Sequence, residues 1–204
     1  MDDSEETIIA GYPNKAHKEA EKHPLTMVGN AVDLGLSVMW ADCNVGTDAE
    51  HPAGGLYGWG DATGEKKSTD LYDYYFAETF LNDISGTKYD IATQKWGGSW
   101  RMPTKENWEE LMKKCQWAVG VQDGMEGYRV WGPNGNKIFL PFTGCRKGTE
   151  VTDTEDEGYY WTSELAKNDR TCAYYYYIDY RFHNDTVGSR TALYAGLAIR
   201  PVCR

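Results

Sequence analysis

The chain has 204 residues, of which 41% are hydrophobic and 14% aromatic, enough for one large domain with a substantial core. Its formal net charge of −10 argues against a nucleic-acid partner, because phosphate recognition needs a basic patch. The sequence contains no run of about 18 apolar residues, so we expect no transmembrane segment, and the acidic residues 1–6 lack the basic and apolar regions of a signal peptide.

The cysteines are scattered along the chain. No Cys-x-x-Cys occurs and no histidine lies near a cysteine at zinc-ligand spacing, so we expect no metal site of this kind. A chain of this length does not need disulfides to fold, and the sequence leaves open one bridge or five free thiols. The five are Cys43, Cys115, Cys145, Cys172 and Cys203.

In chain order, residues 1–30 are predicted to be an N-terminal arm with a short charged helix over residues 14–22. Residues 31–204 are predicted to form a single domain. Its first element is expected to be a half-buried strand over residues 31–40, because apolar residues alternate there with period two. The alternating residues are Val32, Leu34, Leu36, Val38 and Trp40.

The central stretch Trp96–Thr104 places two tryptophans around a Gly-Gly-Ser bend and ends at a helix start. Thr104 is a good N-cap for a helix over Lys105–Lys114, which has an acidic first turn and a basic last turn. Asp90 is expected to cap a shorter helix over Ile91–Trp96. Helical spacing predicts one buried face on the longer helix, formed by Trp108, Leu111, Met112 and Cys115.

The second half of the chain is predicted to be mostly strand. Asn134-Gly135 lies between two apolar runs, which is a strong signal for a β-hairpin. Residues 145–158 are expected to form an acidic loop. Two central helices with strands before and after them favour an α+β fold, and we expect the N- and C-terminal strands to pair. Further strands are expected at Tyr159–Ser163, Ala173–Asp179 and Leu197–Val202.

Five ordered motifs within residues 31–204 resemble the Fibrobacter succinogenes major paralogous domain. The resemblance implies a C-type-lectin-like fold, shared with formylglycine-generating enzymes, with two helices before a small antiparallel sheet and with paired terminal strands. Some variable proteins of diversity-generating retroelements share this fold and carry their mutated residues near the C-terminus. The motifs are Val32–Gly46, Trp96–Thr104, Asn134–Pro141, Tyr159–Ser163 and Ile199–Cys203.

The C-terminal tail, residues 168–204, has an unusual composition. It contains no Lys, Glu, Gln, Met or Trp, although the chain has 6 Met and 8 Trp. These five residue types are the ones that no codon ending in C or T encodes. Retroelement diversification randomises the adenines of AAC codons and reaches every residue type in this tail. Strand composition also depletes Lys, Glu and Gln, so an ordinary tyrosine-rich sheet is the alternative explanation.

If Ala173–Asp179 is a strand, its odd-numbered residues share one face and its even-numbered residues share the other. We expect Tyr174, Tyr176 and Ile178 to point inward. Residues 180–190 are predicted to be an exposed segment whose residue types are typical of binding loops. The predicted ligand-binding residues are Tyr175, Tyr177, Asp179, Arg181, His183, Asn184, Arg190 and Tyr194.

Two other site types are considered. The lectin triplets Glu-Pro-Asn and Gln-Pro-Asp and the Trp-Asn-Asp motif are absent, so no lectin-type Ca²⁺ site is predicted. The acidic residues of 153–157 could hold Ca²⁺, but acidic loops are more commonly just solvated. A formylglycine-generating oxidase needs a redox cysteine pair late in the fold, where this chain offers only Cys172 and Cys203 without a neighbouring base.

The sequence therefore predicts a non-enzymatic, receptor- or adhesin-like binding module without a cofactor. Its ligand is expected to be a protein or a cell-surface glycan. The expected location is a cell surface, the secreted fraction or a phage particle. The alternatives are a surface structural or adhesin domain without diversification and, last, a formylglycine-generating-type oxidase.

Overall fold

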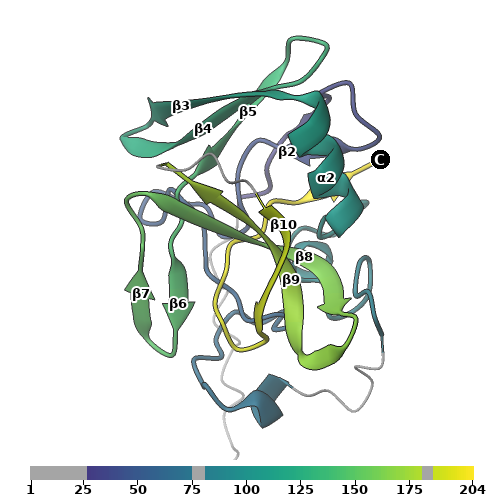
Figure 1. Ribbon diagram of the computed structural model, residues 1–204, viewed down its shortest axis with the longest axis vertical. Helices are drawn as coiled ribbons and strands as arrows, with labels where there is room; N and C mark the ends of the chain where they lie inside the picture. Colours follow the sequence, from purple (N-terminus) through teal and green to yellow (C-terminus); the bar gives the residue numbers. More distant parts are fainter. Residues whose placement is uncertain (1–26, 75–80, 181–185) are drawn as a thin grey trace, which may run out of the picture.

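The computed structural model describes residues 27–74, 81–180 and 186–204, and its arrangement is shown in Figure 1. The fold mixes α and β structure, with few helices and several small antiparallel sheets. Most of the predicted arm, with its expected helix over residues 14–22, lies outside the described residues. Within the described ranges, every helix is too short or too polar to cross a membrane.

The two ends of the domain meet in one small sheet. It contains β1 (Ala31–Val32), β2 (Met39–Ala41) and β11 (Val202–Cys203), in the order β1-β2-β11. Val202 lies directly opposite Trp40 in an antiparallel pair. The predicted pairing of the N-terminal and C-terminal strands is therefore confirmed.

The prediction of one continuous strand over residues 31–40 is wrong. The chain folds back on itself, so that Ala31 lies opposite Ala41. Gly35 has a φ of 74°, in the left-handed region that strands do not use and that glycine adopts without strain. Leu34, Val38 and Trp40 are nevertheless buried. The alternation identified core residues correctly, but it did not require extended backbone between them.

The two predicted α-helices are confirmed with their caps. Helix α1 spans Ile91–Trp96, and the Asp90 carboxylate accepts a hydrogen bond from the Thr93 amide at 3.0 Å. Helix α2 spans Lys105–Lys114 and begins at Thr104. The Thr104 hydroxyl accepts from the Asn107 amide at 3.2 Å, while the Asn107 side chain accepts from the Thr104 amide at 3.1 Å. This reciprocal capping box satisfies two amides at the helix start. A short 3-10 helix, η1, spans Leu71–Tyr74.

A three-stranded sheet carries the predicted hairpin and lies at the top of Figure 1. It contains β3 (Gln116–Gln122), β4 (Met125–Trp131) and β5 (Lys137–Pro141), in that order. The hairpin between β4 and β5 is confirmed, with Gly135 at a φ of 87° in its turn. Strand β3 was not predicted, although Trp117, Val119 and Val121 recur in it at the two-residue spacing of a strand.

A second three-stranded sheet runs through the middle of the molecule (Figure 1). It contains β8 (Glu157–Ala166), β9 (Asp169–Asp179) and β10 (Thr186–Ala192), in the order β10-β9-β8. The predicted strands at Tyr159–Ser163 and Ala173–Asp179 are thus present and longer than expected. Residues 186–190 belong to β10, and within them Ser189 is half-buried and Arg190 is exposed.

Two other predictions for this half need correction. The acidic segment 145–158 is not simply loop, because β6 (Cys145–Lys147) and β7 (Glu150–Thr152) pair within it as a short hairpin. The expected strand Leu197–Val202 is mostly a series of isolated bridges, such as Leu197 to Tyr57. Tertiary pairing with several different partners replaces a regular ladder there.

The sheet β10-β9-β8 separates two hydrophobic clusters. Tyr160 and Tyr176 point into the cluster that also holds Trp108 of α2. Trp161 and Ala173 point to the opposite side, into the cluster that holds Trp59 and other aromatic residues. Both faces of β9 are therefore covered over part of its length. The expectation of one buried and one open face does not hold at the end of the strand either, where Ile178 and Asp179 are buried on opposite faces and Tyr177 is half-buried.

Burial of thiols and phenols predicts a loss of stability in alkaline solution. Desolvation raises the pKa of Cys43 and Cys115 to about 11, and that of Tyr57 and Tyr160 to about 12. The unfolded chain releases these protons at lower pH, so unfolding is favoured increasingly as pH rises from about 9 to about 12. We expect the melting temperature to fall steadily across that window in scanning calorimetry. A flat profile above about pH 9 would contradict this burial.

Candidate ligand-binding surface

Three tyrosines on neighbouring strands form one packed group, which we call the tyrosine surface: Tyr159 of β8 with Tyr175 and Tyr177 of β9. Tyr159 lies directly opposite Tyr177 in the antiparallel pair. Its ring centroid is 5.1 Å from that of Tyr177 and 5.8 Å from that of Tyr175. Tilted contacts at this range are favourable between aromatic rings and restrict their rotation.

Two carboxylates hold the phenol groups of this surface in place. Glu157, at the start of β8, and Asp179, at the end of β9, lie directly opposite each other. The Tyr177 hydroxyl donates to Asp179 Oδ2 at 3.0 Å, and the Tyr159 hydroxyl donates to Glu157. Burial, and then these hydrogen bonds to carboxylates, raise the pKa of both phenols well above their usual range. Both phenols therefore remain neutral hydrogen-bond donors at physiological pH.

The predicted inward orientation of the even-numbered residues of β9 is confirmed for Tyr176 and Ile178. Tyr176 and Ile178 are fully buried, while Tyr175 and Tyr177 are half-buried on the other face. Asp179, which we expected among the exposed residues, is only 4% exposed. Its carboxylate accepts from Tyr177, and its backbone carbonyl accepts from the Tyr128 hydroxyl at 3.1 Å. Asp179 thus acts as a support for the tyrosine surface.

The structure does not bring Arg190 together with the tyrosines. Arg190 lies opposite Tyr174, whereas Ser189 lies opposite Tyr175. Because directly paired residues point to the same side of a sheet, Arg190 lies on the other face. Tyr194 follows β10 in a turn and packs, half-buried, against the cluster that Tyr175 also contacts.

Three other predicted site residues lie outside the described residues. They are Arg181, His183 and Asn184. The part of the predicted site that the structure does assemble is thus Tyr175, Tyr177 and, as their support, Asp179.

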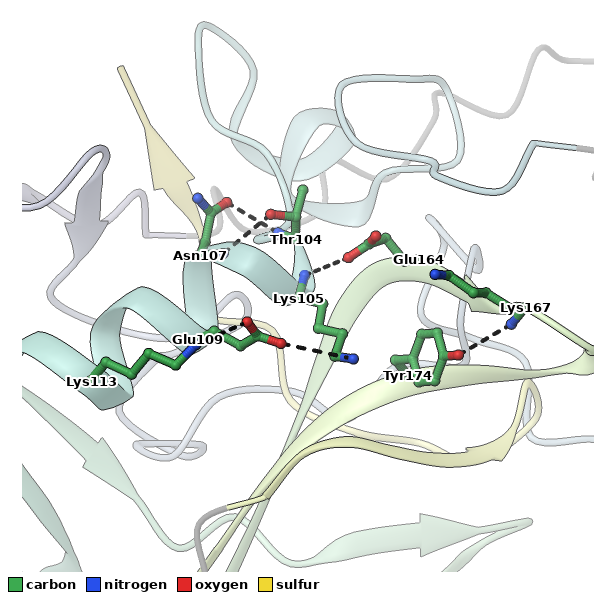
Figure 2. A network of polar contacts seen from close by, with 8 residues as sticks. All are labelled: Thr104, Lys105, Asn107, Glu109, Lys113, Glu164, Lys167 and Tyr174. Carbon is green, nitrogen blue, oxygen red and sulfur yellow. Dashed lines mark hydrogen bonds and ion pairs between the residues drawn. The ribbon is translucent and has the colours of Figure 1, made fainter.

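On the opposite face, Tyr174 is tied to the helix, as Figure 2 shows. Lys105 Nζ lies 5.3 Å from the centre of the Tyr174 ring, and the Tyr174 hydroxyl accepts from the Lys167 amide at 3.2 Å. The Lys105 amide in turn donates to Glu164 of β8 at 2.5 Å. These contacts join α2 to the β8–β9 hairpin, so the strand that presents Tyr175 and Tyr177 is supported from behind.

Sequence reasoning missed Glu157 and Tyr159, which complete the surface from β8. Glu157 was assigned to the acidic loop, and Tyr159 was assigned to a strand without a role in binding. A signal was available, since the alternation of β8 places both on one face. Their position beside Tyr177 depends on the register between β8 and β9, which sequence alone does not specify.

The described residues carry no group of three or more His, Cys, Asp and Glu that would form a metal site. All five cysteines are free in the structure. Comparison of the chain with protein-family models, with curated proteins and with solved structures finds no match. The class established here is thus a mixed α and β domain of small antiparallel sheets, with a tyrosine surface at the end of one of them.

Proposed function

We propose that this chain is a non-enzymatic ligand-binding module with a C-type-lectin-like fold, and that the tyrosine surface is part of its binding site. The observation that carries the proposal is the packing of three half-buried phenol rings, two of which donate hydrogen bonds to carboxylates. Rigid tyrosines offer a large contact area at a low cost in side-chain entropy. The ligand class is a protein or a cell-surface glycan, because aromatic rings with polar hydroxyls suit both.

The composition of the tail supports diversification of this site by a retroelement. Residues 168–204 include all of β9 and β10, the two strands that lead to and from the tyrosine surface. This is the region in which Lys, Glu, Gln, Met and Trp are absent. The motifs that resemble the family lie largely outside it, in the supporting frame. A module of this kind acts at a cell surface, in secreted form or on a phage particle. A reverse-transcriptase gene and a near-copy template repeat beside this gene would support the proposal, and their absence would contradict diversification.

The environment of the late cysteines supports a binding role over an oxidase role. Burial raises the pKa of the Cys172 and Cys203 thiols. A raised pKa disfavours the thiolate that oxidative chemistry needs. The two also lie in different sheets, Cys172 in β9 and Cys203 in β11.

A single substitution tests the binding role. The protein is screened on arrays of glycans and surface proteins, and the captured ligand is then titrated by calorimetry against Tyr177→Ala. We expect a loss of affinity of about tenfold or more, since truncated aromatic anchors commonly cost this much. The melting temperature should change by only a few degrees, because the Tyr177 side chain is itself only half-buried.

Tyr72→Ala is the matched control, since Tyr72 is 82% exposed and lies on η1, away from this sheet. It should bind the ligand as the unmodified protein does. Unchanged affinity in Tyr177→Ala would overturn the assignment of the site. If neither array captures the protein, the structural or adhesin role without diversification becomes the better explanation.

A further inference from the structure

A cleft of about 1170 Å³ adjoins the tyrosine surface but is lined by other residues, one of which, Thr143, accepts a hydrogen bond from the Tyr159 amide at 3.2 Å. Its walls come from the loop of residues 51–57, the turn between β3 and β4, the β6–β7 hairpin, and the segment 63–67. The volume is slightly above the usual range of about 300–1,000 Å³ for small-molecule sites in proteins. Of the ligand-binding residues predicted from the sequence, none that the structure describes lines it.

One wall of the cleft carries a buried cation, Arg146. Its side chain is 4% exposed. Nη1 donates to the Gly148 carbonyl at 2.7 Å and Nη2 to the Leu56 carbonyl at 3.4 Å, whereas Nε has no hydrogen-bond partner among the described residues. These partners are neutral carbonyls, so they orient the guanidinium without cancelling its charge.

Two lysines extend this cationic wall. Lys95 Nζ donates to the Thr63 carbonyl at 3.1 Å, and Lys67 Nζ donates to the Gly64 carbonyl at 3.5 Å, so both reach the same turn. Burial, and then the nearby charge of Arg146, lower the pKa of Lys67. The pKa of a lysine falls beside another cation because a nearby positive charge disfavours the protonated form of the lysine.

Within the described ranges, none of these three cations takes part in an ion pair. The nearby acid, Asp61, accepts hydrogen bonds from its own loop, from the Thr63 amide at 3.2 Å and the Lys66 amide at 3.0 Å. In a chain with a net charge of −10, a wall of three cations without a paired carboxylate is suited to an anionic ligand.

The remaining walls suit the rest of such a ligand. Glu126, Glu155 and Asp156 line the cleft and offer acceptors for hydroxyl groups. Threonine hydroxyls line it as well, and they both donate and accept. They are Thr63, Thr143, Thr149 and Thr154.

We propose that this cleft is a second ligand site, for a small acidic saccharide. The carboxylate or sulfate of the sugar is held by Lys67, Lys95 and Arg146, and its hydroxyls bond to the acidic and threonine side chains. A site with cations on one wall and acceptors on another discriminates against fully anionic molecules and against neutral sugars. This site is independent of the tyrosine surface, so either proposal can fail without the other.

The test measures binding of glucuronate, of glucose as its neutral counterpart, and of inorganic sulfate by calorimetry and by amide NMR shifts. We expect glucuronate to bind at least about tenfold more tightly than either glucose or sulfate, and to shift the amides of Thr63, Gly64 and Thr149. Raising the ionic strength from about 0.05 M to about 0.5 M should weaken the binding, because the attraction is partly Coulombic.

The double variant Lys67→Gln/Lys95→Gln removes two charges at partly exposed side chains and leaves the buried Arg146 in place. We expect it to lose glucuronate binding by about tenfold or more while keeping its melting temperature. Lys113→Gln is the matched control, because Lys113 is a 65% exposed lysine on α2. Equal binding of glucose and glucuronate, or full binding by the double variant, would overturn the proposal. Equally tight binding of sulfate alone would overturn the saccharide part of it.

Discussion

Replacing Arg200 by methionine is expected to lower the free energy of unfolding by about 3–5 kcal/mol, which is a large part of the stability of an ordinary domain. Arg200 is 1% exposed. Nε donates to Asn44 Oδ1 at 2.7 Å, Nη1 to the Ala41 carbonyl at 2.9 Å, and Nη2 to the Phe139 carbonyl at 2.7 Å. One guanidinium thus joins the C-terminal segment to residues beside β2 and within β5.

The effect is large because methionine leaves three buried acceptors without donors. Each unsatisfied buried group costs about 1–3 kcal/mol. Arg200→Lys should recover less than half of the loss, since an ammonium cannot place donors along the three directions of the planar guanidinium. Burial lowers the pKa of Arg200, which reflects how completely water is excluded from this position.

Equilibrium unfolding in urea measures both variants. Arg204→Met provides the control, because Arg204 is exposed and its substitution should change the free energy of unfolding by less than about 0.5 kcal/mol. A loss below about 1 kcal/mol in Arg200→Met would mean that the three acceptors find other donors.

Replacing Trp108 by alanine is the second substitution with a large expected effect. Trp108 of α2 is fully buried and stacks on Tyr176 at 4.6 Å with an interplanar angle of 12°. Its centroid is also 4.7 Å from that of Trp40 and 5.4 Å from that of Tyr160. The ring therefore joins α2, the terminal sheet and the central sheet. We expect a loss of about 3–5 kcal/mol, from lost burial and from the cavity that remains.

This substitution should also loosen the strand that carries the tyrosine surface. Tyr176 stacks on Trp108, and Tyr177 is the next residue on β9. We expect amide hydrogen exchange to accelerate in β9 more than in the β4–β5 hairpin. Trp131→Ala is a matched control at the half-exposed end of β4, and it should cost about 1 kcal/mol and leave β9 unchanged. Uniform acceleration across the domain would instead indicate global unfolding.

The signals that succeeded from sequence alone were local ones. Thr104 and Asp90 marked the starts of both α-helices, because capping requires only a side-chain oxygen a few residues from free amides. Asn134-Gly135 marked the β4–β5 hairpin, because the turn needs a residue with positive φ, which Gly135 supplies at 87°. The alternation in Ala173–Asp179 grouped Tyr176 with Ile178 on one face, and the family resemblance correctly placed that face inside.

The signals that failed depended on partners distant in the sequence. The segment from Ala31 to Trp40 alternates like one strand, yet it bends at Gly35 and pairs with itself. Arg190 and Tyr175 are both on the sheet, but the register of β10, with an irregularity between Val187 and Ser189, turns them to opposite faces. A shift of the strand register by one residue moves every side chain of that strand to the other face, and the composition of the sequence does not reveal the register.

The sequence by itself determined the helix starts, the tight turn, most of the core and the unusual composition of the tail, because each depends on neighbouring residues. The tertiary structure alone decided that Glu157 and Tyr159 join the tyrosines of β9, that Asp179 is a covered support, and that Lys67, Lys95 and Arg146 line one cleft. These groupings bring together residues from separate segments, and long-range packing and strand register set them.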